Sequence, residues 1–481
     1  MANVIGLEVG TTTAKALAIV NGKVVAIASS DGYEPEHPFP GASRQDPSIW
    51  WAMSKQVILR VCRQAEILPA DVDCLVVSGQ MHGLVPNGAG KASLWNDTTA
   101  TKGVDVINNK AKRRRLNVLM HTGNIMGPNM TAAKIADMGA REMKFFTLPA
   151  GSVTRRLIGE SVIDPSDASG TLLWDIRKRC WSQKMLHLVG LSPEQLPRLV
   201  GSLEVAGHVT HEASQETGLR KGTAVLAGGA DQSESALGMG LLPENKGVMG
   251  FEMGTSGVIK AALFVPMPDE QLNTFAHVIG VITFLCTCAC GDAQSFIKNM
   301  LKLSGYASMD ELAADSPIGS RGVTFVPLLA GSRMLGNFDP NGSFLHMSTS
   351  TSNADICRAV QEGIIMEALM GLRVIQSKGI SVRRVILGGG GAKSKHLCQM
   401  VADIFGAEIV VPRISETTVL GAAIRGAVVM GDYPSVDAAC EVLVKPACTY
   451  KPDKKRHNEY TTRVFPRFLR DVEKVTGCKV R

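Results

Sequence analysis

The amino-acid sequence predicts an α/β protein built from two related domains, and three observations support this prediction. The chain has 481 residues, more than one hydrophobic core usually supports, and 45% of them are hydrophobic. A segment rich in glycine and threonine at 5–15, IGLEVGTTTAK, returns at 249–259 as MGFEMGTSGVI. A pattern of strand, glycines and helix at 221–240 returns at 383–400. Each half of the chain therefore contains both elements.

The boundary between the two domains is expected within GMGLLPENKG at 238–247, where proline and glycine interrupt the pattern. We place one domain at 1–243 and the other at 244–481, and we expect them to face one another across a cleft. The final stretch at 459–475, EYTTRVFPRFLRDVEKV, is amphipathic and predicts a closing helix.

Within the first half, alternating apolar residues on both sides of Asn21-Gly22 predict a β-hairpin. A helix is expected from Pro47 to about Ala65, followed by a buried strand in DCLVVSG at 73–79. The glycines of 221–240 are expected to form a turn between a strand and a helix. The basic run KAKRRR at 110–115 is typical of a solvated helix face, and nucleic-acid binding is the weaker interpretation.

Composition narrows the classes of function. The net charge of +7 fits small anionic ligands at least as well as nucleic acid, and no nucleic-acid partner is predicted. Eleven scattered cysteines indicate reduced thiols, and the alternating Cys286, Cys288 and Cys290 favour buried positions over a metal site. No stretch approaches the roughly 20 apolar residues of a membrane helix. We therefore expect a cytoplasmic protein without a membrane partner.

The repeated hairpins predict phosphate binding. Glycine lacks a Cβ and threonine adds a short hydroxyl donor, so such turns allow backbone amides to approach a polyphosphate closely. Glu8 lies on the strand just before the first turn, where an acid could hold a hydrated Mg²⁺. The alternative for Glu8 is an exposed acid on an edge strand, paired with a lysine such as Lys15. Glu252 occupies the corresponding place in the second copy.

Polar residues near strand ends predict the remainder of a site. Asp231 follows Gly228-Gly229-Ala230, where its carboxylate could accept a proton from a substrate hydroxyl, or could cap a helix. SGQMHG at 78–83 and LWNDT at 94–98 collect amides, an imidazole, an acid and an indole ring. This mixture suits a polyhydroxylated ligand, which needs paired donors and acceptors. The expected sugar contacts from these segments are Gln80, His82, Trp95, Asn96 and Asp97.

An ordered set of motifs along residues 5 to about 430 resembles the FGGY carbohydrate kinases. The set comprises GLEVGTTTAK, SGQMHG, LWND, DPSDASGTLLWD, AGGADQ, GTSG, FVPLLAGSR, LGGGGAKS and VLGAA. The resemblance implies two actin-like, or ribonuclease H-like, domains that close over ATP, Mg²⁺ and a ketose. It implies transfer of the γ-phosphoryl group to the terminal sugar hydroxyl, with D-xylulose as the first candidate for the sugar. It also suggests a homodimer. The alternatives are another pentulose or a polyol as substrate, or a catalytically weak sensor of nucleotide or sugar.

The resemblance also assigns roles to residues of this chain. The general base falls on Asp231, and the substrate contacts fall on Gln80, Met81, His82, Asp231 and Gln232. The expected ATP-binding residues are Gly10, Thr11, Thr12, Thr13, Lys15, Gly254, Thr255, Ser256, Gly388, Gly389, Gly390, Gly391, Ala392 and Lys393. The expected metal ligands are Glu8 and Asp231. The family usually has Asp where this chain has Glu8, and GERTPH where this chain has GSRMLG at 331–336.

Overall fold

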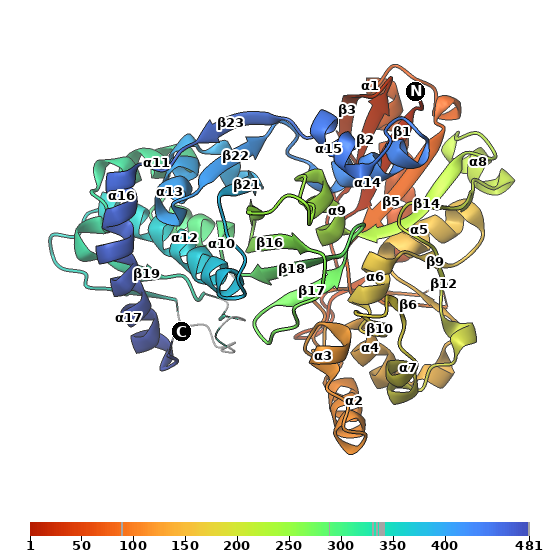
Figure 1. Cartoon of the computed structure of the whole chain (residues 1–481), viewed down its shortest axis with the longest axis horizontal. Coiled ribbons are helices and arrows are strands. Elements are labelled where there is room, and N and C mark those ends of the chain that lie inside the picture. Colours follow the sequence, from red (N-terminus) through yellow and green to blue (C-terminus); the bar gives the residue numbers. More distant parts are fainter. Residues whose placement is uncertain (88–89, 288, 330, 333–334, 336–341, 480–481) are drawn as a thin grey trace. The chain divides into compact units, whose positions relative to one another are not determined.

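The computed structural model describes residues 1–87, 90–287, 289–329, 331–332, 335 and 342–479. Two compact units form (Figure 1). Unit 1 comprises 1–243, 262–283 and 416–444, and unit 2 comprises 244–261, 284–415 and 445–481. The sequence analysis expects one boundary, between residues 243 and 244, and the first boundary of the structure lies there. The structure differs because the chain returns to unit 1 twice, at 262–283 and at 416–444.

Unit 1 contains a six-stranded sheet in the order β13-β14-β5-β1-β2-β3. Its strands are β1 (Val4–Val9), β2 (Ala14–Val20), β3 (Lys23–Ser29), β5 (Cys74–Gly79), β13 (Val205–His208) and β14 (Ala224–Ala230). The predicted hairpin at Asn21-Gly22 is confirmed as the β2–β3 connection, and the buried strand expected at 73–79 is confirmed as β5.

Helices and short strands complete unit 1. The helices are α1 (Pro47–Gln64), α2 (Thr101–Arg113), α3 (Val118–Thr122), α4 (Thr131–Met138), α5 (Pro149–Ile158), α6 (Pro165–Gly170), α7 (Gln183–Val189), α8 (His211–Thr217), α9 (Asp231–Gly238), α14 (Thr417–Val429) and α15 (Val436–Leu443). The short strands are β4 (Arg44–Gln45), β6 (Val85–Pro86), β7 (Ala92–Ser93), β8 (Phe146–Thr147), β9 (Val162–Ile163), β10 (Trp174–Asp175), β11 (Cys180–Trp181) and β12 (Arg198–Leu199). Helix α1 begins as expected, since Asp46 accepts a hydrogen bond from the Ser48 amide and Pro47 fits the first helical position.

Close packing explains why 416–444 belongs to unit 1. Helix α14 lies against β1, and a Cβ added to Gly6 would come within 2.2 Å of the Val419 carbonyl oxygen. Helices α9 and α14 also touch through glycines, because a Cβ on Gly238 would lie 1.8 Å from the Thr417 carbonyl oxygen. Glycine at position 6 therefore admits a helix to the sheet surface, which is a different role from the phosphate contact expected of the motif.

A seven-stranded sheet has the order β17-β18-β16-β15-β21-β22-β23. Strands β15, β21, β22 and β23 belong to unit 2, β16 and β18 carry residues of both units, and β17 lies in the 262–283 segment of unit 1. The strands are β15 (Val248–Met253), β16 (Gly257–Leu263), β17 (Asn273–Ala276), β18 (Val281–Cys286), β21 (Arg384–Gly388), β22 (Glu408–Pro412) and β23 (Pro446–Tyr450), with a separate pair of β19 (Thr324–Val326) and β20 (Ser343–Leu345). The helices are α10 (Gly291–Met300), α11 (Tyr306–Asp315), α12 (Asn353–Ser377), α13 (Lys395–Phe405), α16 (Lys454–Glu459) and α17 (Phe465–Thr476).

The two sheets share one core order. In unit 1 it reads β3-β2-β1-β5-β14, and in the second sheet β18-β16-β15-β21-β22. In each case the middle strand pairs antiparallel with the strand that follows it and parallel with a later strand. The internal repeat of the sequence therefore corresponds to a repeated sheet topology, as expected.

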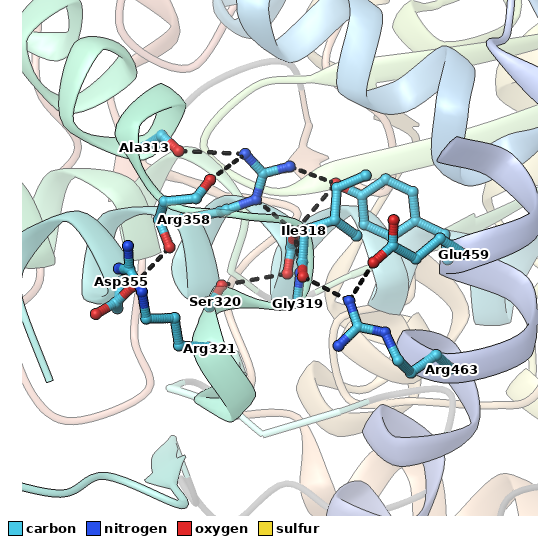
Figure 2. A network of polar contacts seen from close by, with 12 residues as sticks. Ala313, Ile318, Gly319, Ser320, Arg321, Asp355, Arg358, Glu459 and Arg463 are labelled. Atoms are coloured by element: carbon cyan, nitrogen blue, oxygen red, sulfur yellow. Dashed lines mark hydrogen bonds and ion pairs between the residues drawn. The ribbon is translucent and has the colours of Figure 1, made fainter. Parts of the chain in front are cut away.

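The closing helix predicted at 459–475 is confirmed as a helical segment of unit 2, with a π-helical turn at Tyr460–Val464 between α16 and α17. Figure 2 shows how the segment is held to α12. Arg358 donates to Glu362 (2.8 Å) and to the Tyr460 hydroxyl (2.9 Å), and Tyr460 donates to the same Glu362 oxygen (3.0 Å). Among the described residues, no helix is long and apolar enough to cross a membrane.

Candidate active site

The carboxyl ends of three neighbouring parallel strands bring the main candidates of unit 1 together. Strand β5 lies between β1 and β14, and its last residue, Gly79, pairs with Val9 on one side and Ala230 on the other. The first hairpin turn, Gln80 and Asp231 each follow directly after these residues. Since neighbouring strands lie about 4.8 Å apart, the three candidates share one edge of the sheet.

Asp231 is the first residue of α9, and it follows β14 without an intervening turn. The prediction of a glycine turn before it was wrong, because Gly228 and Gly229 lie inside β14. Asp231 and Gln232 are half-buried, and the Asp231 carboxylate accepts the Gln232 amide at 2.7 Å. The Ala230 amide donates to the Ser166 hydroxyl at 2.9 Å. The backbone that carries Asp231 is therefore fixed by α6.

A buried ionic cluster lies behind Asp231, and it explains Gly229. Arg425 on α14 pairs with Glu234 on α9, and it lies 3.8 Å from Asp164. A Cβ on Gly229 would come within 1.9 Å of the Glu234 carboxylate and 2.5 Å of the Arg425 guanidinium. Burial raises the pKa of Glu234 to about 7, although the charge of Arg425 opposes the shift. Gly229 therefore makes room for this ion pair.

Asp167 belongs to the same cluster and lies in the DPSDASGTLLWD motif, from which the sequence predicts no site residue. Burial raises its pKa well above the usual range, and the negative charges of Asp164 and Asp231 add to the shift. Its Oδ1 atom has no hydrogen-bond partner among the described residues. A protonated Asp167 avoids a further negative charge near Asp231. Neither Asp167 nor Arg425 stood out from the sequence, since their significance depends on contacts between distant segments.

The first hairpin turn is bound by side chains from other parts of unit 1. Gln45 donates to the Thr11 carbonyl at 3.2 Å, and the Trp95 indole donates to the Thr11 hydroxyl at 3.1 Å. The Tyr33 hydroxyl donates to the Gly10 carbonyl at 2.8 Å. The structure therefore brings the turn together with Trp95, which is 40% exposed.

The rest of the turn is accessible. Thr12 is exposed, and Thr11 and Thr13 are half-buried. The Gly10 amide already donates to the Thr13 carbonyl at 3.0 Å, so a phosphate would have to use the amides and hydroxyls of 11–13.

Glu8 and Lys15 face one another across the hairpin. They are direct partners in the β1–β2 register, and both are half-buried. The Lys15 ammonium lies 2.6 Å from Glu416. Burial lowers the pKa of Lys15, but the hydrogen bond to Glu416 and the charge of Glu8 outweigh burial and place the pKa above its usual value. The charge of Glu8 therefore acts on Lys15, as the alternative for Glu8 expects, but the ion pair of Lys15 is with Glu416, and β1 is a central strand and not an edge.

Two loops supply the expected sugar contacts: the 80–82 loop after β5 and the 94–97 loop after β7. His82 has a left-handed backbone (φ 61°), and its Nδ1 lies 2.7 Å from the Gly170 carbonyl. The Oε1 atom of Gln80 and the Oδ1 atom of Asn96 are buried without a partner in the described part of the chain. Buried acceptors of this kind need donors, and ligand hydroxyls are donors.

Other members of the two loops have structural roles. Met81 is 3% exposed and packs against Gly170. Asp97 is fully buried, accepts from the Ser43 amide (2.8 Å) and the Thr99 hydroxyl (2.6 Å), and lies 3.3 Å from Arg44. The Asp97 carboxylate therefore fixes the 94–97 loop, and the structure gives it no exposed face for a sugar.

Unit 2 brings together the second hairpin turn and the 388–393 segment. Gly388 pairs with Glu252 on β15, and a short 3-10 turn spans Gly390–Lys393. A Cβ on Gly389 would lie 2.6 Å from the Met253 carbonyl oxygen, whereas a Cβ on Gly390 would meet nothing within 4 Å. Gly390 and Lys393 are exposed, and Gly391 and Ala392 are half-buried.

The second turn lies against the start of α10. The Gly254 carbonyl accepts the Gly291 amide at 2.9 Å, and the Thr255 carbonyl accepts the Cys290 amide at 3.0 Å. Thr255 is exposed and Ser256 half-buried, so this turn also has accessible donors. Its acid, Glu252, lies 2.9 Å from the buried ammonium of Lys260.

No group of three or more acidic, histidine or cysteine side chains among the described residues could hold a metal by itself. Glu8 and Asp231 are two carboxylates at the same sheet edge. Two carboxylates fit Mg²⁺ carried on phosphates, because such an ion takes one or two carboxylates and keeps water and phosphate oxygens as its other ligands. Arg333 and Gly336 of the altered GSRMLG segment lie outside the described residues.

Family models match most of the chain. Residues 3–238 match the N-terminal domain of the FGGY family of carbohydrate kinases, and residues 273–430 match its C-terminal domain. The chain therefore belongs to this family. It is a carbohydrate kinase of two actin-like domains, with a sugar and ATP as substrates.

Relatives and solved structures are consistent with this assignment. Xylulose kinase of Escherichia coli (strain K12) is 30% identical over 422 residues, which cover 84% of this chain and 85% of the relative. Ligand-bound xylulose kinase from Lactobacillus acidophilus shares the fold with a TM-score of 0.89 at 22% identity, over 99% of both chains. Gluconate kinase from the same organism has a TM-score of 0.88 at 22% identity, over 98% of both chains. The fold alone therefore does not select among sugars.

Proposed function

We propose that the protein phosphorylates D-xylulose to D-xylulose 5-phosphate with ATP as the phosphoryl donor. The observation that carries this proposal is the shared sheet edge, where the first hairpin turn, Gln80 and Asp231 follow neighbouring strands. The sugar itself comes from the relatives, among which the 30% identical protein is a xylulose kinase.

In the proposed mechanism, Asp231 accepts the proton of the attacking sugar hydroxyl. Gln80, His82, Trp95 and Asn96 orient the sugar, and the buried acceptors of Gln80 and Asn96 receive its hydroxyl protons. Amides and hydroxyls of 11–13 and 254–256 stabilise charge on the phosphates, while 388–393 borders the adenosine. Glu8 and Asp231 would hold Mg²⁺, which supplies charge neutralisation for the phosphates.

The test is a coupled ADP-release assay across pentuloses, hexuloses, polyols and a control without sugar. Stimulation by D-xylulose above all other sugars supports the proposal. Stimulation by another pentulose or a polyol would assign a different substrate to the same site. Omitting Mg²⁺ should abolish the sugar-dependent rate, and a rate that is independent of divalent ions would remove Glu8 from its metal role.

A second candidate is a weakly catalytic sensor of nucleotide or sugar. It is favoured by Glu8, which lies opposite Lys15 in a network that includes Glu416. Measurable ATP binding without stimulation by any sugar would support this candidate. A homodimer and a cytoplasmic location remain predictions of the sequence, and light scattering measures the first of them.

A further inference from the structure

Helix α4 contains a buried lysine that the sequence did not single out. Lys134 is 4% exposed, and its neighbours Ala132, Ala133 and Ile135 are fully buried. A buried ammonium needs hydrogen-bond partners, because its transfer from water is otherwise too costly. Burial lowers the pKa of Lys134 to about 7, and the charge of Asp97 opposes this shift.

The partners of Lys134 are two backbone carbonyls in the expected sugar-binding loops. Its Nζ donates to the His82 carbonyl at 2.8 Å and to the Leu94 carbonyl. The first belongs to the 80–82 loop and the second lies at the start of the 94–97 loop. A single β-bridge between Leu84 and Ser93 joins the same two segments nearby. Lys134 therefore connects both loops from the side of α4.

Both loops need such support. His82 has φ of 61°, which is rare for a residue with a side chain and persists where neighbouring groups hold it. Each loop also holds a buried acceptor without a partner in the described chain, on Gln80 and on Asn96. The separation of these two acceptors depends on the separation of the carbonyls of His82 and Leu94, which share one ammonium.

We propose that Lys134 is a positioning residue for the sugar, which sets the spacing between the 80–82 and 94–97 loops. The sugar-binding part of this proposal rests on the proposed function. Lys134 does not take part in proton or phosphoryl transfer. Its effect is confined to the loops, and it acts on sugar affinity and not on nucleotide affinity.

The experiment compares Lys134→Met with Lys110→Met. Methionine keeps an unbranched apolar stem, in a side chain one heavy atom shorter than that of lysine, and removes the donor. Lys110 is the control for loss of a hydrogen bond from lysine to a backbone carbonyl, because its Nζ donates to the Leu188 carbonyl at 2.8 Å and to neither loop, although Lys110 is exposed. The exchange rates of the Gln80, Leu94 and Asp97 amides measure how firmly the two loops are held. The values of kcat and KM are measured for D-xylulose and for ATP separately.

We expect Lys134→Met to speed exchange at these loop amides at least tenfold, with β1 and β5 unchanged. The KM for D-xylulose should rise at least tenfold, while kcat and the KM for ATP stay within about threefold of wild type. Lys134→Gln keeps an N–H donor and should recover part of the sugar KM. Lys110→Met should change neither quantity.

Two results would overturn the proposal. The first is a loop exchange rate in Lys134→Met equal to that of wild type. The second is a uniform increase in exchange rate across β1, β5 and the loops in both Lys134 variants, which would show that Lys134 has only a structural role. Failure of the proposed function is distinct. If wild type phosphorylates no sugar, the proposed function fails, and the exchange data alone decide whether Lys134 spaces the loops.

Discussion

The two hairpins that the sequence repeats are built differently. The first turn has four residues between the paired Val9 and Ala14, whereas the second has three between Met253 and Gly257. Side chains of Tyr33, Gln45, Gln80 and Trp95 bind the first turn, whereas backbone amides at the start of α10 bind the second. The two copies of the motif therefore have different surroundings. The first turn contacts side chains of the 80–82 and 94–97 loops, and the second contacts backbone amides beside a glycine turn.

The glycine repeats differ in the same way. Gly228 and Gly229 lie within β14, and their missing Cβ atoms leave space for Ala150 and for the Glu234–Arg425 pair. Gly390 lies in a turn and faces open space. Similar glycine runs therefore serve packing in unit 1 and accessibility in unit 2.

The largest effect is expected for Asp231, which directly follows Gly228 and Gly229 of β14 in unit 1. Asp231→Asn removes the proposed proton acceptor and keeps the shape of the side chain, so kcat should fall by about 10²–10⁴-fold. The affinity for ATP, measured by calorimetry, should stay within about threefold of wild type. A kcat equal to that of wild type would remove Asp231 from its role.

The next effect separates the two glycine runs. Gly229→Ala places a methyl group on the buried Glu234–Arg425 pair, and breaking such a pair costs about 3–5 kcal/mol. Gly390→Ala meets no atom and should change the free energy of unfolding by less than about 0.5 kcal/mol. Urea unfolding of both variants measures the difference, and equal destabilisation would contradict the packing role of Gly229.

Periodicity and turn residues were sufficient to predict the duplicated α/β fold, α1, β5 and the C-terminal helical segment, because these signals are local. Gln80 and Asp231 were expected near strand ends, but their meeting at one edge depends on the order of the strands, which places β5 between β1 and β14. The roles of Gly6 and Gly229 could not be predicted, since they depend on α14, which comes about 200 to 400 residues later. Lys134 had a local signal, a single lysine among TAAKIA, but its partners are set by loops 40 and 52 residues away.

The two hairpin acids should respond differently to neutralisation. Glu252→Gln removes the charge 2.9 Å from Lys260, which is fully buried, and should cost about 2–3 kcal/mol. Glu8→Gln should cost less than about 1 kcal/mol, because Lys15 is 31% exposed and keeps Glu416. Glu8→Gln should instead raise the Mg²⁺ concentration needed for half-maximal rate. An unchanged Mg²⁺ titration would leave Glu8 as the partner of Lys15 alone.

The smallest effect compares two buried glutamates. Glu234 has Arg425 beside it, whereas Glu367 on α12 has a buried Oε2 without a partner among the described residues. Burial raises the pKa of Glu367 to about 8. The folded protein therefore keeps a proton that the unfolded chain loses above about pH 4.5, so stability falls as pH rises from about 4.5 to 8.

Glutamine at position 367 cannot ionise and removes this loss. Glu367→Gln should therefore stabilise the protein by about 1–2 kcal/mol at pH 9 and by much less at pH 5. Glu234→Gln should have the opposite sign at pH 9, because it takes a negative charge from Arg425. Thermal unfolding of both variants at pH 5 and pH 9 measures the two signs. Destabilisation by Glu367→Gln at pH 9 would mean that this carboxylate is ionised and compensated, which would erase the contrast between the two glutamates.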